Sequence, residues 1–448
     1  MAKRVLLVGA GLVGSLLAIY MRRRGYEVDV YERRGDMRSQ SYSGGRSINL
    51  ALSDRGIRAL EDLGLMDRIR PIAIPMHGRQ IHQADGKQVY QPYGMSGQFI
   101  NSVSRGELNK TLMSLAEEEG ARFHFQHRCV SVDWSTNAVH FNTETGKPAV
   151  ATADLIFAAD GAFSAARLQY QLNHDRFQYQ QSYIDFGYKE LTIPADESGG
   201  FQLEPHALHI WPRKNYMLIA LPNPDGTFTC TLFFPFEGDP SFGSLQTDEQ
   251  IRTFFETQFT DATRLMPDIV AQYKTNPNSS LVTVKCYPWV HQDRFALIGD
   301  AAHAIVPFFG QGMNCGFEDC FVLNGLMDKY GENWVDLLQA YQALRKPDGD
   351  AIAELALNNF LEMRDRVADP KFLLQKKIES RIHARNPDQW VPAYSQVTFS
   401  PHIRYSEALV NSMRQEAIMQ QLMARPDIEE VWDRPEIENW ILDKLHKR

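Results

Sequence analysis

The sequence is poor in cysteine and has no paired-cysteine motif. It contains only five cysteines in 448 residues: Cys129, Cys230, Cys286, Cys315 and Cys320. No two of them form a CxxC, and an odd count argues against a disulfide framework. Cys315 and Cys320 could suggest a metal or redox pair, but their spacing inside an apolar helical stretch favours ordinary core thiols. We therefore expect no metal site.

Long hydrophobic runs and a large charge excess are also missing. No 18 consecutive residues are apolar, so we expect no membrane span. A net charge of −8 gives no reason to expect a nucleic-acid partner. The first strand-like run begins at Val5 and leaves no room for a signal peptide, which predicts a cytoplasmic protein. With 448 residues the chain exceeds what one hydrophobic core usually organises, so two or three domains are expected.

The most informative motif that is present lies near the N-terminus. Gly9-Ala10-Gly11-Leu12-Val13-Gly14 follows the apolar run Val5–Val8, which predicts a buried strand, and opens a helix to Met21. A second strand, Val28–Tyr31, leads into Glu32, 18 residues after Gly14. Glycines let the backbone approach a pyrophosphate, and a helix N-terminus offers free N–H groups. A lone GxGxxG can be a packing turn, but in this context it predicts dinucleotide binding, with Glu32 accepting from a ribose hydroxyl.

Two further motifs follow predicted buried strands. Ala153–Ala159 runs into Asp160-Gly161, and Phe295–Ile298 runs into Gly299-Asp300. Open α/β sheets bind ligands at the carboxyl ends of their strands, where Asp300 can accept from a ribityl hydroxyl of a flavin. The loop Pro307–Asn314 then feeds a helix whose N-terminus can face the flavin pyrimidine, although a simple strand–loop–helix connection gives the same pattern. Together with the first motif, these features predict one FAD.

The pattern along the rest of the chain indicates an α/β fold with three parts. From about Tyr183 apolar and polar residues alternate, which predicts an antiparallel sheet, and from Asn333 onward the pattern is mostly helical. We expect a Rossmann-like FAD-binding domain (1–72, 101–175 and 284–332), a substrate domain with an antiparallel sheet (73–100 and 176–283), and a helical C-terminal region over the substrate site (333–448).

This combination of motifs resembles the single-component, FAD-dependent aromatic hydroxylases, which also have only one classical nucleotide fold. Within that family, five segments are similar to the kynurenine 3-monooxygenases: Gly45–Ser53, Ser102–Asn109, Pro307–Asn314, Asn359–Arg364 and Val397–Ser400. These similarities reach from the N-terminus to about residue 410. Eukaryotic members carry a membrane-anchoring tail, whereas the highly charged stretch Asp427–Arg448 is interrupted by Pro435. That difference predicts a soluble, bacterial-type version, and leaves open whether it forms a homodimer.

The resemblance implies which residues hold the substrate. Arg79 and Tyr93 would bind the amino-acid carboxylate of L-kynurenine, with Asn359 and Tyr394 completing the clamp. Arginine suits bidentate pairing with a carboxylate, and a phenol and an amide add directional hydrogen bonds. The alternatives are a surface salt bridge for Arg79, a turn for Tyr93, a helix cap for Asn359 and a core position for Tyr394.

The resemblance also implies the cofactor contacts. For non-covalent FAD they are Gly9, Gly11, Val13, Gly14, Tyr31, Glu32, Arg33, Arg34, Ala51, Arg105, Val130, Asp160, Asp300, Met313 and Asn314. Asp160-Gly161 would serve both FAD and a passing NADPH. Arg105 can neutralise pyrophosphate charge, although it can also be a simple cation at a helix start.

The implied reaction is the hydroxylation of L-kynurenine to 3-hydroxy-L-kynurenine in tryptophan degradation. NADPH reduces FAD, O₂ adds to give a flavin C4a-hydroperoxide, and its distal oxygen attacks the ring. Because the ring amine already activates the ortho carbon, we assign no catalytic side chain. Two alternatives remain: an FAD hydroxylase of another aromatic substrate, and a flavin-dependent reductase or dehydrogenase that never activates oxygen.

Overall fold

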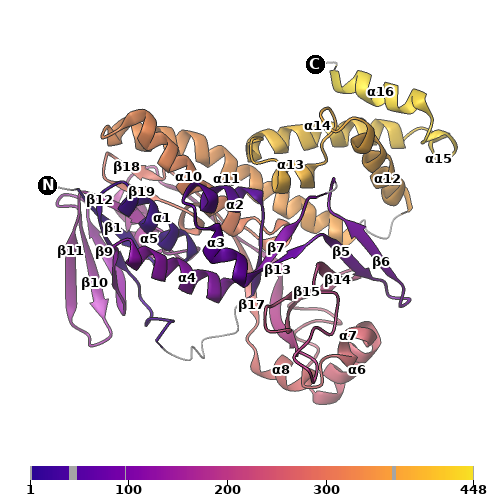
Figure 1. Ribbon diagram of the computed structural model, residues 1–448, viewed down its shortest axis with the longest axis horizontal. Helices are drawn as coiled ribbons and strands as arrows, with labels where there is room; N and C mark the ends of the chain where they lie inside the picture. The colour runs from indigo at the N-terminus through magenta and orange to yellow at the C-terminus, as the bar shows by residue number, and fades with distance from the viewer. Residues whose placement is uncertain (1–2, 40–47, 96, 366–369, 447–448) are drawn as a thin grey trace.

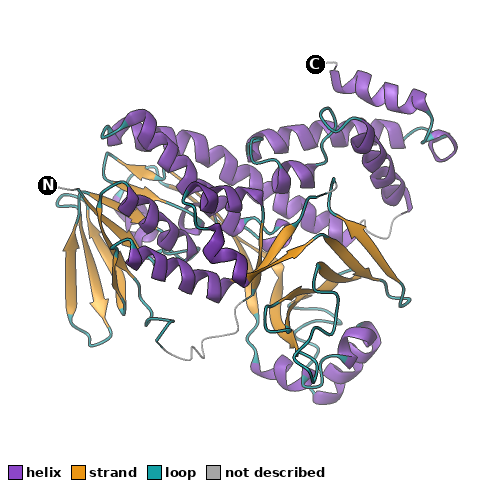
Figure 2. Ribbon diagram, viewed as in Figure 1, coloured by secondary structure: helices purple, strands orange, loops and turns teal. Residues whose placement is uncertain are grey.

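The computed structural model describes residues 3–39, 48–95, 97–365 and 370–446, the side chains of 363–365 excepted. Residues 45–47 of the motif Gly45–Ser53 lie outside this range. The molecule is a mixed α/β protein with a parallel sheet on one side, a second large sheet beside it, and helices of the C-terminal region over the junction (Figures 1 and 2). This architecture agrees with the predicted fold class.

The parallel sheet is built from short strands, of which β12 and β19 are entirely apolar. Its order is β18-β19-β12-β1-β2-β8, and its members are β1 (Arg4–Val8), β2 (Glu27–Tyr31), β8 (Arg122–His124), β12 (Leu155–Ala158), β18 (Val290–His291) and β19 (Phe295–Leu297). All neighbours pair in parallel except β18 and β19. Since β19, β12 and β1 are adjacent, the three predicted motifs meet at the carboxyl ends of three neighbouring strands.

Helices and two small sheets surround the parallel sheet. The helices are α1 (Leu12–Arg23), α2 (Asp54–Asp62), α3 (Met66–Ile69), α4 (Arg105–Glu118), α5 (Ala165–Asn173), α9 (Asp300–His303) and α10 (Gly312–Tyr330), with the 3-10 turns η1 (Arg70–Ile72) and η2 (Pro307–Phe309). One small sheet contains β9 (His127–Asp133), β10 (Ala138–Thr143) and β11 (Pro148–Thr152); the other contains β3 (Asn49–Leu52), β4 (Ala73–Met76) and β7 (Ile100–Ser104). Helix α1 packs against α4 and α10.

The second large sheet has the order β17-β13-β16-β15-β14-β5-β6. Its strands are β5 (Gly78–His82), β6 (Gln88–Pro92), β13 (Gln178–Ile193), β14 (Ala207–Arg213), β15 (Tyr216–Pro222), β16 (Phe228–Pro235) and β17 (Ser279–Tyr287). The expectation of a purely antiparallel sheet needs one correction, because β5 and β14 pair in parallel. No hairpin joins these strands, so no tight turn imposes the antiparallel direction.

Three helices that alternation did not predict cover one face of this sheet. They are α6 (Asp248–Gln258), α7 (Thr260–Arg264) and α8 (Ile269–Thr275), seen at the bottom of Figure 1. Apolar residues of these helices pack with Leu218, Cys230 and Leu232 of the sheet in one core. Along each of these strands every second residue faces the helices, and the residues between them point to the opposite face of the sheet.

The C-terminal region is helical, with α11 (Trp334–Asp365), α12 (Pro370–Arg385), α13 (Ala393–Phe399), α14 (Tyr405–Met423), α15 (Ile428–Val431) and α16 (Pro435–His446). Pro370 begins α12 and Pro392 directly precedes α13, as the predicted breaks require. No helix in the described ranges is both long and apolar enough to cross a membrane. We propose the three-part division given above, supported by the separate strand sets of the two large sheets.

Candidate functional site

A cavity of about 870 Å³ extends from the carboxyl ends of the parallel strands to the second sheet. The predicted residues that line it are Gly9, Gly11, Val13, Tyr31, Glu32, Arg33, Arg34, Ala51, Arg105, Val130, Asp160, Asp300, Met313, Arg79, Asn359 and Tyr394. Three others, Gly14, Asn314 and Tyr93, do not line it. The structure thus brings together residues that lie as far apart in the chain as Gly9 and Tyr394.

The glycines after β1 have two different physical roles. A Cβ on Gly14 would lie 2.1 Å from the carbonyl oxygen of Gly9, and a Cβ on Gly9, whose φ is +103°, would lie 2.6 Å from that of Ala159. These two glycines permit close backbone packing. A Cβ on Gly11 would meet no protein atom within 4 Å, because Gly11 faces the cavity at the N-terminus of α1. Such an open cradle beside free N–H groups fits a pyrophosphate.

Glu32 follows β2 and organises the backbone around the cavity. Its Oε2 accepts from the N–H of Ala10 at 3.0 Å, and its Oε1 accepts from the N–H of Arg34 at 3.0 Å. Each carboxylate oxygen can accept more than one hydrogen bond, so a ribose hydroxyl can still be bound. Tyr31 lines the same cavity, but its ring is stacked between His124 and Phe141 at centroid distances of 4.4 and 4.3 Å.

Asp300 is a carboxylate prepared for a ligand. It lines the cavity as the first residue of α9, and no described residue donates a hydrogen bond to its side chain. Burial raises the pKa of the Asp300 carboxyl above its ordinary value, and the charge of Arg105 opposes this change. A half-buried acceptor without a protein donor fits a ribityl hydroxyl, because an unsatisfied buried acceptor is costly.

Asp160 has partners within the protein. Its Oδ1 accepts from the hydroxyl of Ser164 at 2.5 Å, and its Oδ2 accepts from the N–H groups of Ala165 and Ala166 at 2.8 and 3.1 Å. Burial raises the pKa of the Asp160 carboxyl, although these donors favour the charged form. The carboxylate therefore fixes the start of α5 against the cavity.

Asn314 acts from behind the cavity wall. Its Oδ1 accepts from the N–H of Ser53 at 2.9 Å, and its Nδ2 donates to the carbonyls of Ala51 and Gly310, both at 2.8 Å. The side chain thereby joins β3 to the turn before α10. Direct contact with the cofactor stays a prediction for Asn314, as it does for Gly14.

Arg79 is an unpaired cation at the other end of the cavity. Its Cζ lies 4.4 Å from the ring centroid of Tyr394 and 5.4 Å from that of Tyr93. No described carboxylate pairs with it, and its buried Nε has no acceptor. Burial lowers the pKa of Arg79, but the neighbouring phenols of Tyr394 and Tyr93 keep that pKa above its ordinary value. A permanently charged guanidinium with free donors in an apolar cavity fits an anionic ligand.

The other residues predicted to bind the substrate come from three other segments. Tyr93, after β6, is 4% exposed, and its buried hydroxyl has no partner. Its ring stacks on Tyr394 of α13 with centroids 5.7 Å apart, and Tyr394 stacks on Phe309 at the same distance. Asn359 of α11 lines the cavity and donates from Nδ2 to the carbonyl of Phe308 at 2.8 Å. The clamp is therefore connected directly to the turn η2.

A buried ionic network behind the cavity was missed by sequence reasoning. Asp319 of α10 accepts from the N–H of Gly299 at 3.0 Å, from Arg345 Nε at 2.7 Å, and pairs with His303 Nε2 at 2.6 Å. It thus positions the Gly299-Asp300 turn. Burial lowers the pKa of His303, but the negative charge of Asp319 outweighs burial and holds that pKa well above its ordinary value. The signal in the sequence was Glu318-Asp319, two adjacent acids in an apolar helical stretch.

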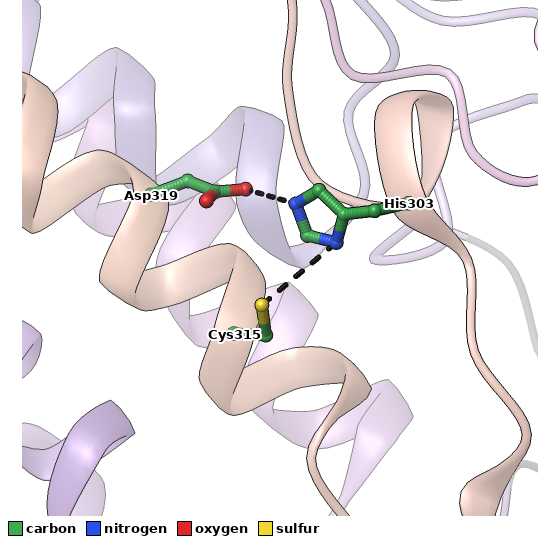
Figure 3. A group of neighbouring side chains, drawn as sticks. All are labelled: His303, Cys315 and Asp319. Carbon is green, nitrogen blue, oxygen red and sulfur yellow. Dashed lines mark hydrogen bonds and ion pairs between the residues drawn. The ribbon is translucent and has the colours of Figure 1, made fainter. Parts of the chain in front are cut away.

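His303, Cys315 and Asp319 form a compact cluster with metal-ligand chemistry (Figure 3). Their ligand atoms lie within 4.8 Å of one another. Arg345, however, donates to Asp319 and lies 3.3 Å from Cys315 Sγ. A guanidinium on two of the three ligands opposes a metal cation, so the cluster is better explained as a satisfied network that supports the turn.

Comparisons with known proteins place the fold and the chain in context. The family described as FAD binding domain matches residues 2–356. A kynurenine 3-monooxygenase of Flavobacterium johnsoniae is 49% identical over 445 residues, 99% of each chain, and one of Myxococcus xanthus is 49% identical over 404 residues, 90% of this chain and 86% of the relative. Among solved structures, 2-methyl-3-hydroxypyridine-5-carboxylic acid oxygenase has a TM-score of 0.65 with 22% identity, covering 82% of this chain and 94% of its own. Tetracycline destructase Tet(55) has a TM-score of 0.63 with 16% identity, covering 89% and 97%.

Proposed function

The chain belongs to the kynurenine 3-monooxygenase family of FAD-binding proteins, and we propose that it hydroxylates L-kynurenine to 3-hydroxy-L-kynurenine with NADPH and O₂. Its cofactor is FAD. The full-length similarity to bacterial relatives supports the substrate assignment, and the geometry of the cavity supports it independently.

The observation that carries the proposal is the unpaired cation Arg79 in the cavity that also contains Gly11 and Asp300. An aromatic amino acid has a carboxylate at one end and an apolar ring at the other. Arg79, framed by the phenols of Tyr93 and Tyr394, suits the carboxylate. The wall beyond it is apolar and suits the ring.

The chain's own residues bind and position. Gly9, Gly11 and the N-terminus of α1 would hold the pyrophosphate of FAD, Glu32 the ribose and Asp300 the ribityl chain. Bound FAD supplies the redox chemistry, accepting a hydride from NADPH and activating O₂. The N-terminus of α10, at Gly312, carries a positive dipole end that stabilises negative charge on the flavin pyrimidine.

No side chain needs to act as a base at the ring. His127 is the only histidine among the described residues lining the cavity, and it lies beside Arg128 on β9, with the residues predicted to hold FAD. The substrate's own amine activates the ortho carbon. The apolar walls exclude water, which protects the reaction from competing hydrolysis.

The test is a comparison of NADPH oxidation with and without kynurenine in air. Purified protein should be yellow, release its flavin on denaturation, and form 3-hydroxykynurenine while kynurenine stimulates NADPH oxidation. Stimulation by another aromatic acid but not by kynurenine would reassign the substrate. Reduction of a quinoid acceptor without oxygen consumption would instead support the reductase.

We further propose that the enzyme works in the cytoplasm, supported by five buried cysteines that are all free. Fractionation of the source cells tests the location. A homodimer also stays a proposal, and the mass of the purified protein in solution tests it.

A further inference from the structure

One wall of the cavity is the face of the second sheet that α6, α7 and α8 leave uncovered. The cavity-lining residues of β14, β15 and β16 alternate along each strand, as side chains on one face must. They are Leu208, Ile210, Met217, Ile219, Leu221, Thr231 and Phe233. Thr231 is the only one of the seven with a polar side chain.

Thr231 has a hydroxyl with no hydrogen-bond partner among the described residues. It is 6% exposed and lines the cavity, and no described residue makes a hydrogen bond with its Oγ1. A valine would fill the same volume on a strand, so packing alone does not require this hydroxyl. A buried hydroxyl on an otherwise apolar wall fits a ligand with a polar group at that depth.

The register of the strands places Thr231 well away from the carboxylate clamp. Arg79 pairs with Leu208 across β5 and β14, whereas Ile210, Ile219 and Thr231 form the next row on the same face. Three strand spacings separate β5 from β16, or about 14 Å. A ligand whose carboxylate meets the Arg79 side chain therefore extends its other end toward Thr231.

We propose that the hydroxyl of Thr231 accepts a hydrogen bond from the ring amine of the substrate and thereby positions the ring carbon beside that amine. This inference rests on the proposed function. In L-kynurenine the carboxylate lies at one end and the aminophenyl ring at the other, with the amine on the ring carbon next to the ketone. A carboxylate at Arg79 therefore places the ring and its amine on the side of Thr231. Thr231 is thus a determinant of specificity for aromatic amines.

The same hydrogen bond favours the reaction. When the ring carbon gains oxygen, electron density moves from the amine into the ring, and the amine nitrogen becomes more positive. Its N–H groups then donate more strongly, so an acceptor already in place stabilises the transition state more than the ground state. Loss of the hydroxyl should reduce product formed per NADPH as well as affinity.

The test compares Thr231→Val and Thr231→Ser in the FAD-loaded enzyme. Val keeps the shape and removes the hydroxyl, and should weaken kynurenine binding about tenfold and lower the yield of product per NADPH. Ser restores the hydroxyl and should recover most of both. FAD content and melting temperature should stay near those of the unmodified enzyme.

Thr229→Val is the matched control. Thr229 lies on the same face of the same strand but is not among the residues lining the cavity, and its Oγ1 accepts from Asn223 Nδ2 at 3.0 Å. Thr229→Val should therefore lower the melting temperature, while kynurenine affinity and product yield should be unchanged. An equal loss in this variant would show that any Thr→Val change in β16 disturbs the site. Tyr188 on β13 supplies the other hydroxyl of this wall. If Tyr188→Phe rather than Thr231→Val lowers the yield, the assignment to Thr231 is wrong.

A ligand analogue identifies the hydrogen-bond partner. The desamino analogue of kynurenine keeps the carboxylate and the ketone but lacks the ring amine. Its dissociation constant, measured by quenching of flavin fluorescence, should be the same for the unmodified enzyme and Thr231→Val. A tenfold difference with this analogue too would assign Thr231 to the ketone and overturn the proposal. Failure of the unmodified enzyme to hydroxylate kynurenine would instead overturn the proposed function.

Discussion

The two ends of the cavity are constructed in different ways. The end predicted to bind FAD, called the FAD end below, consists largely of backbone: glycine turns after parallel strands, the N-termini of α1 and α10, and carboxylates such as Glu32 that fix those turns. The end predicted to bind the substrate consists of single side chains, with Arg79 of β5 beside Tyr394 of α13. A backbone site is damaged by adding atoms, whereas a side-chain site is damaged by removing them.

Removal of Arg79 should have the largest effect and should act on the substrate alone. Arg79→Ala takes away the charge that is predicted to pair with the carboxylate, a loss of about 2–5 kcal/mol for a buried pair. The kynurenine dissociation constant should rise strongly while FAD content stays normal. Arg105→Ala is the reciprocal control, because this cavity-lining residue is predicted to contact FAD. If Arg79→Ala lost flavin, the two ends would not be separate.

Addition of atoms should be the more damaging change at the FAD end. Gly11→Leu would place a side chain in the open space at the start of α1. Filling space meant for a ligand costs about 1–3 kcal/mol, or roughly ten- to a hundredfold in FAD affinity. The apoprotein should remain folded, as circular dichroism can verify.

Gly325→Leu is the matched control for this substitution. Its Cβ would also meet no atom within 4 Å, but Gly325 lies on the exposed side of α10 and does not line the cavity. FAD affinity should be unchanged. Equal affinities for Gly11→Leu and the control would remove Gly11 from the pyrophosphate site.

The far face of the second sheet contains a buried chain of hydrogen bonds that titrates. His82 Nδ1 lies 2.7 Å from Asp261 Oδ2, His82 Nε2 lies 2.9 Å from His209 Nδ1, and His209 Nε2 lies 2.9 Å from the carbonyl of Glu204. In neutral His209, Nε2 donates to the Glu204 carbonyl, so Nδ1 is left to accept from His82 Nε2. Burial, together with the charge of His82, lowers the pKa of His209 to about 4.

Acid should therefore destabilise the part of the protein that contains the second sheet. In the unfolded chain His209 has its ordinary pKa of 6.5, whereas in the folded protein its pKa is about 4. Between these two pH values the unfolded form binds a proton that the folded form does not bind. Stability is complete above this window and falls as pH drops through it, by about 2 kcal/mol at a pH of about 5. Thermal melting from neutral pH downward should show a smaller slope in His209→Gln, and an unchanged slope would exclude His209.

Tyr394→Phe should have the smallest effect. The ring keeps its stacking with Tyr93 and Phe309, and only one hydroxyl is removed, worth about 0.5–1.5 kcal/mol. Kynurenine binding should weaken modestly, and stopped-flow reduction of the flavin by NADPH should respond less to kynurenine. Full loss of binding would show that the phenol, rather than Arg79, dominates the clamp.

The same contrast explains how much the sequence could predict. A glycine turn after an apolar strand is a local pattern, so Gly9–Gly14 and Gly299-Asp300 were visible in the sequence. The predicted strand Val5–Val8 differs from the observed β1 by one residue only. The clamp was accessible only through resemblance, because no local pattern connects Arg79 with Tyr394. Asp319 was missed for the same reason, since its partner Arg345 is on another helix. The helices α6–α8 were hidden within a segment interpreted as sheet.

The interleaving of the parallel sheet has a consequence for biosynthesis. β1 is made at the start of the chain, but β12 and β19, which complete its side of the sheet, end at Ala158 and Leu297. The ribosome must therefore release about two thirds of the chain before the FAD end can close, and Tyr394 follows still later. Cofactor capture belongs to the nearly finished polypeptide, and a prematurely terminated chain carries the first glycine motif without ever acquiring the site.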